Sequence, residues 1–231
     1  MVPDKPAAAA AFAPPASAGK KAGKAEAEFK RLVGASERLG LEEVEALCEE
    51  LGIDGAADTA ILVVLYAMGV KSLADGVSRE QFVQGMVNLD CDSVAALKGK
   101  LEVQRAKLLA GGAAGDAFFA PFWTWAYVFN CAEGQKSLTL DVARGLTKLL
   151  LRPERFPLVA EWVAFLEQAG PKTAVSKDTW ALLLDFGRKI KPDLSNYDAD
   201  GGAWPSVIDD FCEWLVKSRR GVGGGGAGAG R

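Results

Sequence analysis

Apolar side chains recur every three or four residues along most of this chain, between two tails of simple composition. Three segments of the first half carry the repeat most clearly: Phe29, Leu32 and Val33; Val44, Leu47, Cys48 and Leu51; and Ile61, Val64, Leu65 and Met68. This spacing places apolar side chains on one face of an α-helix. Because no segment of useful length in the sequence alternates with the period of a β-strand, we predict an all-α fold.

Polar residues stand where several of these helices should begin. Asp58 precedes the third apolar segment and can cap it with its carboxylate. Ser78 followed by Gln81 has the spacing of a capping box. Thr139 can cap a later helix, and the pair Trp204-Pro205 opens the last one, because proline is favoured in the first turn.

The composition of the two ends sets them apart from the helical region. Residues 1–24 are mostly Ala, Pro, Gly and Lys, and residues 219–231 are mostly Gly, so we expect both tails to be disordered or flexible. The folded region is then 25–218. The glycine-rich stretch around 111–115 interrupts it, which predicts two helical subdomains, about 25–110 and 116–218.

Composition also excludes several classes of chemistry. The 231 residues contain no histidine, the usual general base and the commonest metal ligand. Four cysteines, Cys48, Cys91, Cys131 and Cys212, are scattered without a C-x-x-C pair, so no zinc site is expected. We therefore predict no cofactor, no metal and no catalytic residue; a helical enzyme that uses Asp or Cys chemistry is the alternative.

Charge and hydropathy bear on location and partners. The net charge of −3 gives no general attraction for nucleic acid or an anionic membrane. No apolar run in the sequence reaches the length of a membrane span. We expect neither nucleic acid nor membrane as a partner, and a protein of the cytoplasm or nucleus, although the Ala-rich stretch 7–13 leaves a transit peptide open.

Some segments have features of calcium-binding EF-hands. Residues 196–201 offer oxygen ligands followed by glycine, but Val207 stands where a bidentate Glu is needed and Pro205 interrupts the loop. Segments 29–51 and 58–86 have the helix-loop-helix rhythm of paired EF-hands without the ligands. We expect degenerate EF-hand-like pairs that serve as scaffold in the first subdomain; a calcium sensor is the alternative.

Four short motifs follow one another in the last quarter of the chain: Lys177-Asp178-Thr179-Trp180, Asn196-Tyr197-Asp198, Gly202-Ala203-Trp204-Pro205 and Ile208-Asp209-Asp210-Phe211. Asp178 and Asp209 stand near the starts of predicted helices, where a carboxylate is electrostatically favoured and open to a partner. Helix capping alone would also explain them. In order and spacing, the motifs resemble the C-terminal half of the potentiating-neddylation domain of the defective-in-cullin-neddylation family.

The resemblance implies a scaffold that binds the C-terminal winged-helix region of a cullin through an Asp–Ala–Asp patch. The matching positions are Asp178, Ala203 and Asp209, and all three residue types are present. Two carboxylates offer charge-assisted acceptors to a basic surface, and a methyl side chain leaves room for close approach. The RING protein that associates with cullins is a further candidate partner.

The resemblance also implies an apolar pocket for the acetylated N-terminal Met of the neddylation conjugating enzyme. Alignment on Gly134-Gln135-Lys136 assigns Phe129 and Leu149 to its walls. The first subdomain would supply the other residues: Leu41, Val44, Ile61, Val64, Leu65 and Met68. Acetylation removes the amine charge, so an apolar slot can accept the methionyl group. The alternative is a divergent cullin-binding adaptor that does not recruit the conjugating enzyme.

Overall fold

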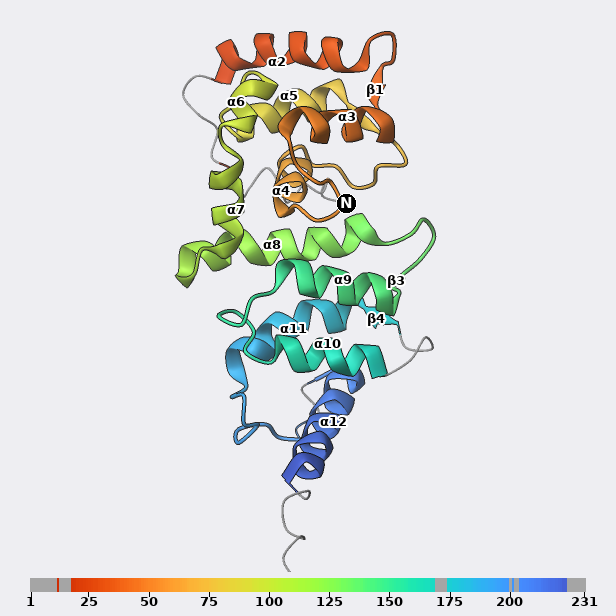
Figure 1. Ribbon diagram of the computed structural model, residues 1–231, viewed down its shortest axis with the longest axis vertical. Coiled ribbons are helices and arrows are strands. Elements are labelled where there is room, and N and C mark those ends of the chain that lie inside the picture. Colours follow the sequence, from red (N-terminus) through yellow and green to blue (C-terminus); the bar gives the residue numbers. More distant parts are fainter. Residues whose placement is uncertain (1–11, 13–17, 169–173, 200, 202–203, 224–231) are drawn as a thin grey trace, which may run out of the picture. The chain divides into compact units, whose positions relative to one another are not determined.

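The computed structural model describes residues 12, 18–168, 174–199, 201 and 204–223 (Figure 1). Over these residues the chain is built of helices, labelled α2 to α12, with two pairs of two-residue antiparallel strands. The all-α prediction is confirmed. Contacts divide the chain into two compact units, unit 1 up to Asn130 and unit 2 from Cys131 onward.

Unit 1 contains two helix-strand-helix pairs followed by further helices. Its elements are α2 (Ala18–Val33), β1 (Arg38–Leu39), α3 (Leu41–Leu51), α4 (Thr59–Ala67), β2 (Val77–Ser78), α5 (Arg79–Asn88), α6 (Val94–Lys98), α7 (Leu101–Leu109) and α8 (Gly112–Asn130). Strand β1 pairs with β2, and α2 packs along α5 (Figure 1). This is the EF-hand-like arrangement expected from the sequence.

Unit 2 contains the same kind of strand pair, which was not predicted from the sequence. Its elements are β3 (Ser137–Leu138), α9 (Leu140–Leu150), α10 (Val159–Gln168), β4 (Val175–Ser176), α11 (Lys177–Lys189) and α12 (Ser206–Gly223). Strand β3 pairs antiparallel with β4, with Leu138 opposite Val175. Helix α10 packs on α9 and on α12. The core of unit 2 contains the buried side chains of Trp162, Trp180, Phe186 and Phe211.

The expected capping residues begin their helices as predicted. The Asp58 carboxylate accepts from the backbone N–H of Ala60 at 2.8 Å. Ser78 and Gln81 form a reciprocal capping box at the start of α5, and Thr139 caps α9. Each cap satisfies donors that the first helical turn leaves without an intrahelical partner.

The N-terminal tail prediction is wrong for residues 18–24, which form the first turns of α2. Alanine favours helix, and ion pairs hold this turn: Lys24 Nζ lies 2.9 Å from Asp92 Oδ2, and Lys21 pairs with Asp90. Phe12 is also buried, with its ring 5.6 Å from that of Phe118 between centroids. Residues 1–11 and 13–17 of that tail lie outside the described residues.

The other end of the folded region also extends further than predicted. Helix α12 continues to Gly223, so residues 219–223 are helical; residues 224–231 of that tail lie outside the described residues. The Arg219 guanidinium donates to the Pro192 carbonyl at 2.8 Å, which ties this last part of α12 to the segment after α11. Helix α12 therefore continues past residue 218 into the glycine-rich part of the sequence.

The boundary between the two units also differs from the prediction. Gly112 has a positive φ of 73°, so the glycine stretch does interrupt the chain between α7 and α8. Helix α8 nevertheless packs on α7 and α4 and belongs to unit 1. The unit boundary falls at 130–131 because the aromatic side chains of α8, such as Phe122, pack against Tyr66 of α4.

Close packing of α5 against the end of α4 explains why residue 85 is a glycine. A Cβ added at Gly85 would lie 2.8 Å from Met68 Cα and would overlap its Cγ. Only glycine permits this approach, which holds Met68 in the core of unit 1. Within the described part of the chain, no helix is both long enough and apolar enough to cross a bilayer.

Candidate functional site

Asp178 lies in the first turn of α11 and is exposed. The Ser176 hydroxyl caps this helix by accepting from Thr179 N at 3.1 Å. The next two side chains, Thr179 and Trp180, are buried in unit 2. Because successive residues point 100° apart around a helix, burying these two turns Asp178 toward solvent. The carboxylate also benefits from the positive end of the helix dipole.

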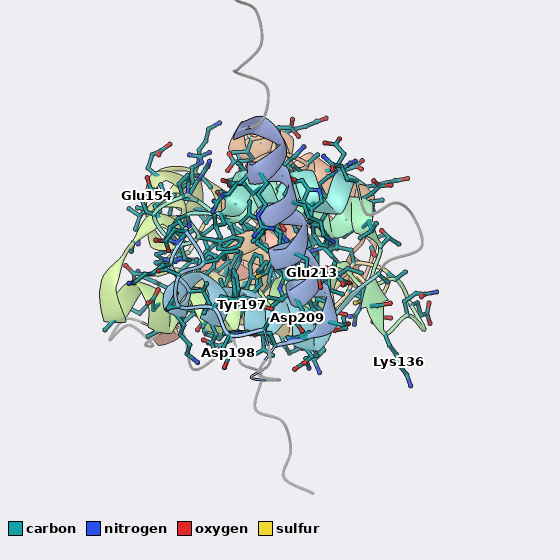
Figure 2. All side chains as sticks on the ribbon, turned by 90° about the horizontal axis from the view of Figure 1, so that it is seen from below. Lys136, Glu154, Tyr197, Asp198, Asp209 and Glu213 are labelled. Carbon is teal, nitrogen blue, oxygen red and sulfur yellow. The ribbon has the colours of Figure 1, made fainter. Side chains whose placement is uncertain are left out.

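Asp209 lies in the first turn of α12, which packs on α11. Its neighbours Ile208 and Phe211 are fully buried, whereas Asp209 is half-buried. Its Oδ1 accepts a hydrogen bond from the Tyr197 hydroxyl at 2.6 Å. Figure 2 shows Tyr197 and Asp209 together beside the start of α12, with Glu154 well apart from them. The two candidate carboxylates thus begin adjacent helices of one unit.

The third residue of the expected patch, Ala203, lies outside the described residues. The structure therefore brings Asp178 and Asp209 into one unit and leaves the position of Ala203 a prediction.

Tyr197 is a residue of this site that the sequence analysis did not single out. Burial, together with its hydrogen bond to Asp209, raises the pKa of the Tyr197 hydroxyl far above its usual range. The hydroxyl also lies in hydrogen-bond contact with the Cys212 thiol, whose pKa burial raises to about 12. Both groups therefore stay protonated at neutral pH. The signal available in the sequence was the tyrosine of the Asn-Tyr-Asp motif itself.

The residues expected to hold the acetylated methionine differ widely in exposure. Val44 of α3 and Ile61, Val64, Leu65 and Met68 of α4 and its C-terminus are buried. Leu41, the first residue of α3, is 58% exposed. Helix α4 is buried on nearly all sides, since Leu62 alone among residues 60–67 is not buried. In unit 1 the expected pocket residues therefore belong mainly to the core.

The two remaining pocket residues are half-buried. Phe129 lies in the last turn of α8 and stacks on Trp125, with 4.8 Å between ring centroids. The Trp125 indole donates to the Val70 carbonyl at 2.6 Å, which fixes this stack against the end of α4. Leu149 lies in α9 of unit 2. Phe129 is thus a partly open apolar surface of unit 1, as a pocket wall requires.

A cavity of about 460 Å³ lies elsewhere in unit 1, and none of the expected pocket residues line it. It lies between the end of α2, strand β1 and the start of α5; its lining includes Phe29, Lys30, Val33, Arg38, Ser78 and Glu80. Charged side chains form much of its wall, so it is not suited to an uncharged methionyl group.

Burial limits the chemistry available to three of the four cysteines. Burial raises the pKa values of Cys48 and Cys91, as it does that of Cys212, so these thiols are not thiolate nucleophiles at neutral pH. In the part of the chain that the structure describes, no three Cys, Asp or Glu side chains are placed to hold a metal ion.

The EF-hand-like sequence at 196–201 has a structural role at Asn196. Its side-chain oxygen accepts from Lys191 N at 2.8 Å, and its amide donates to the Lys189 carbonyl at 2.7 Å. The segment therefore closes the C-terminus of α11.

Comparison with known families and proteins gives a consistent result. Residues 97–214 match the model of a family described as Cullin binding. DCN1-like protein 4 of Drosophila melanogaster is 36% identical over 183 residues, which cover 79% of this chain and 70% of that protein. DCN1-like protein 5 of Homo sapiens is 32% identical over 187 residues, which cover 80% of this chain and 74% of that protein.

Proposed function

The chain belongs to the cullin-binding family of DCN1-like proteins, and we propose that it is a scaffold that binds a cullin and the neddylation conjugating enzyme together and promotes cullin neddylation. The observation that carries this proposal is the pair Asp178 and Asp209. Both carboxylates begin helices that pack on one another, and the carboxylate of Asp178 is exposed.

The cullin is bound through these carboxylates, with Ala203 completing the patch. The partner surface is the winged-helix region of the cullin, which presents cations to them. Paired charges of this kind steer encounter and fix orientation, and an interfacial pair that excludes water also slows dissociation. Neither carboxylate has to break an ion pair within the described residues before it meets the partner.

The conjugating enzyme is bound through its acetylated N-terminal methionine. In unit 1, Phe129 and Leu41 are the expected pocket residues with exposed surface, so these two would contact the methionyl group. The five buried residues would shape the pocket from behind. An apolar slot favours the acetylated form because an ammonium group would lose its hydration without gaining a partner.

The protein itself contributes no reacting group in this proposal. Holding the charged enzyme next to the cullin raises the effective concentration of the thioester and restricts its orientation toward the acceptor lysine. The high pKa values of the buried thiols agree with a role that does not pass the modifier through this chain.

A reconstituted reaction tests the proposal. The full chain is added to a cullin, with and without its RING protein, and the charged conjugating enzyme, and transfer to the cullin is timed. We expect faster transfer to the cullin and an unchanged rate of discharge to free lysine. Replacing Cys48, Cys91, Cys131 and Cys212 by Ser, one at a time, should preserve the stimulation in every variant that folds. A modifier thioester trapped on this chain would overturn the non-catalytic role.

A further inference from the structure

The hydrogen bond between Tyr197 and Asp209 joins two segments that are separate in sequence. Tyr197 belongs to the turn after α11, and Asp209 to the first turn of α12. The 2.6 Å distance between the Tyr197 hydroxyl and Asp209 Oδ1 is that of a charge-assisted hydrogen bond. One oxygen of the carboxylate is therefore held by this unit, and no donor among the described residues occupies Oδ2, which leaves it for a partner.

The turn that carries Tyr197 is held by several hydrogen bonds. Asn196 bridges the backbone of Lys189 and Lys191, and the Asp193 carboxylate accepts from Ser195 N at 2.9 Å. Leu194 has a φ of 60°, an unfavourable backbone conformation for a leucine. Such a conformation persists only where the surroundings require it. These contacts hold the turn in a single conformation, and that conformation positions Tyr197.

The Tyr197 ring is also fixed by packing. It lies edge-on to the buried Phe186 of α11, with 6.4 Å between ring centroids. The ring is half-buried, so its hydroxyl has little freedom to leave Asp209. Because burial keeps this hydroxyl protonated at any physiological pH, it acts as a donor throughout.

Asp178 offers a direct contrast within the same unit. It is exposed in the first turn of α11, and no side chain of the described residues holds its carboxylate by a hydrogen bond or ion pair. Asp178 must therefore be ordered when a partner binds, whereas Asp209 is ordered beforehand. Ordering a side chain at an interface costs conformational entropy and so opposes binding. This cost should be larger for Asp178 than for Asp209.

We propose that Tyr197 is a positioning residue for cullin binding, which holds Asp209 Oδ1 so that Oδ2 is presented to a cation of the cullin. The inference rests on the proposed function, since it concerns how one carboxylate of that patch is prepared. Tyr197 need not touch the cullin to act in this way.

The test is a set of double-mutant cycles on the full chain, with affinity for the cullin measured at low ionic strength so that weakened complexes remain measurable. Tyr197→Phe removes the hydroxyl and keeps the ring. We expect it to weaken binding roughly three- to tenfold, in the range of the net contribution of one hydrogen bond. The same loss is expected in an Asp178→Ala background. In an Asp209→Ala background Tyr197→Phe should change affinity less than about twofold.

Kinetics and stability separate this role from a structural one. Tyr197→Phe leaves the charge of the patch unchanged, so the association rate should stay the same and the dissociation rate should rise. Equal losses from Tyr197→Phe in all three backgrounds, or no loss in the parent chain, would overturn the positioning role. If Asp209→Ala alone leaves cullin affinity unchanged in a folded protein, the proposed cullin patch fails first.

Discussion

The carboxylates proposed for the cullin and the apolar side chains proposed for the conjugating enzyme differ in how they meet solvent. In unit 2, Asp178 is exposed and Asp209 half-buried, each at the start of a helix. In unit 1, Ile61 and Val64 are buried in a helix surrounded by core. The carboxylates are open to a partner in the folded protein. Most of the apolar side chains instead contribute mainly to the stability of the fold.

The ion pairs of unit 1 differ from Asp178 of unit 2 in a similar way. In unit 1, Asp58 is paired with Arg105, and Asp90 with both Lys21 and Lys100. These pairs connect elements of the fold. Asp178 in unit 2 has no such cation among the described residues. An unpaired carboxylate on a helix is available to a partner, as the proposed cullin patch requires of Asp178.

The largest effect is expected at Asp178. Asp178→Arg places a cation opposite the basic surface of the cullin, and we expect a loss of about 2–5 kcal/mol in binding free energy, as for breaking a desolvated interfacial charge pair. The free energy of unfolding should change by no more than about 0.5 kcal/mol, because the side chain is exposed. Calorimetric titration with the cullin and chemical denaturation measure the two quantities.

A matched variant controls for net charge. Glu154 is an exposed carboxylate of the same unit that lies apart from Asp209 in Figure 2. Glu154→Arg makes the same change of charge and should leave cullin affinity within about twofold of the parent at physiological salt, since exposed charges beyond a Debye length are screened. If both reversals weaken binding equally, the patch has no special role.

Substitution of the buried residues expected in the pocket should lower the free energy of unfolding, in contrast to substitution of Asp178. Ile61→Ala removes a buried side chain and should lower the free energy of unfolding by about 3 kcal/mol. Leu41→Ala should lower it by about 0.5 kcal/mol or less, because Leu41 is 58% exposed. Denaturant titrations of both variants measure this. Similar losses of stability at the two positions would contradict the division into core and surface.

Binding of the conjugating enzyme should depend on acetylation. A peptide with the acetylated N-terminus of that enzyme should bind at least tenfold more tightly than the unacetylated peptide, a difference of about 1.4 kcal/mol. Leu41→Ala and a Phe129→Ala variant should reduce binding of the acetylated peptide, as fluorescence anisotropy would show. Equal affinity for both peptides would favour a cullin-binding adaptor that does not recruit the enzyme.

Much of the fold follows from local signals in the sequence. Apolar residues three and four apart indicated the helices, and Asp58, Ser78 and Thr139 marked their starts because each side chain satisfies a backbone donor close in sequence. The exposed position of Asp178 was predictable because a carboxylate near a helix start is electrostatically favoured and open to solvent. The ends of the folded region were not, because Lys21 and Arg219 are held by contacts distant in sequence.

Other features of the candidate sites depend on contacts that periodicity does not encode. Helix α4 is apolar on all sides, so its sequence does not show which residues face a partner. The Tyr197–Asp209 hydrogen bond spans 12 residues and depends on a turn with Leu194 in the left-handed region, which the residue type does not favour. The assignment of the binding residues themselves stays a prediction from resemblance.

The smallest expected effect concerns a charge that holds the fold. Arg105 Nε donates to Asp58 Oδ1 at 3.0 Å, and this interaction lowers the pKa of the Asp58 carboxyl below its usual 3.8. A depressed carboxyl pKa stabilises the folded state above the pKa of the unfolded chain, and this contribution is lost as pH falls through the folded value. Arg105→Met should therefore lower the free energy of unfolding by about 1 kcal/mol at neutral pH.

The pH dependence distinguishes this loss from a loss of packing. The difference between the parent and Arg105→Met should be constant above about pH 5. It should shrink as pH falls below 3.8, where the Asp58 carboxyl becomes protonated first in the unfolded chain and then, at lower pH, in the folded chain. Arg79→Met is the control, because among the described residues Arg79 pairs only with exposed Glu80 and half-exposed Glu26. Its free energy of unfolding should differ from that of the parent by nearly zero at every pH. Urea titrations between pH 7 and 3 measure both. A loss at Arg105 that stays the same across this range would show that the side chain acts through its methylene packing and that the Asp58 pair contributes little to unit 1.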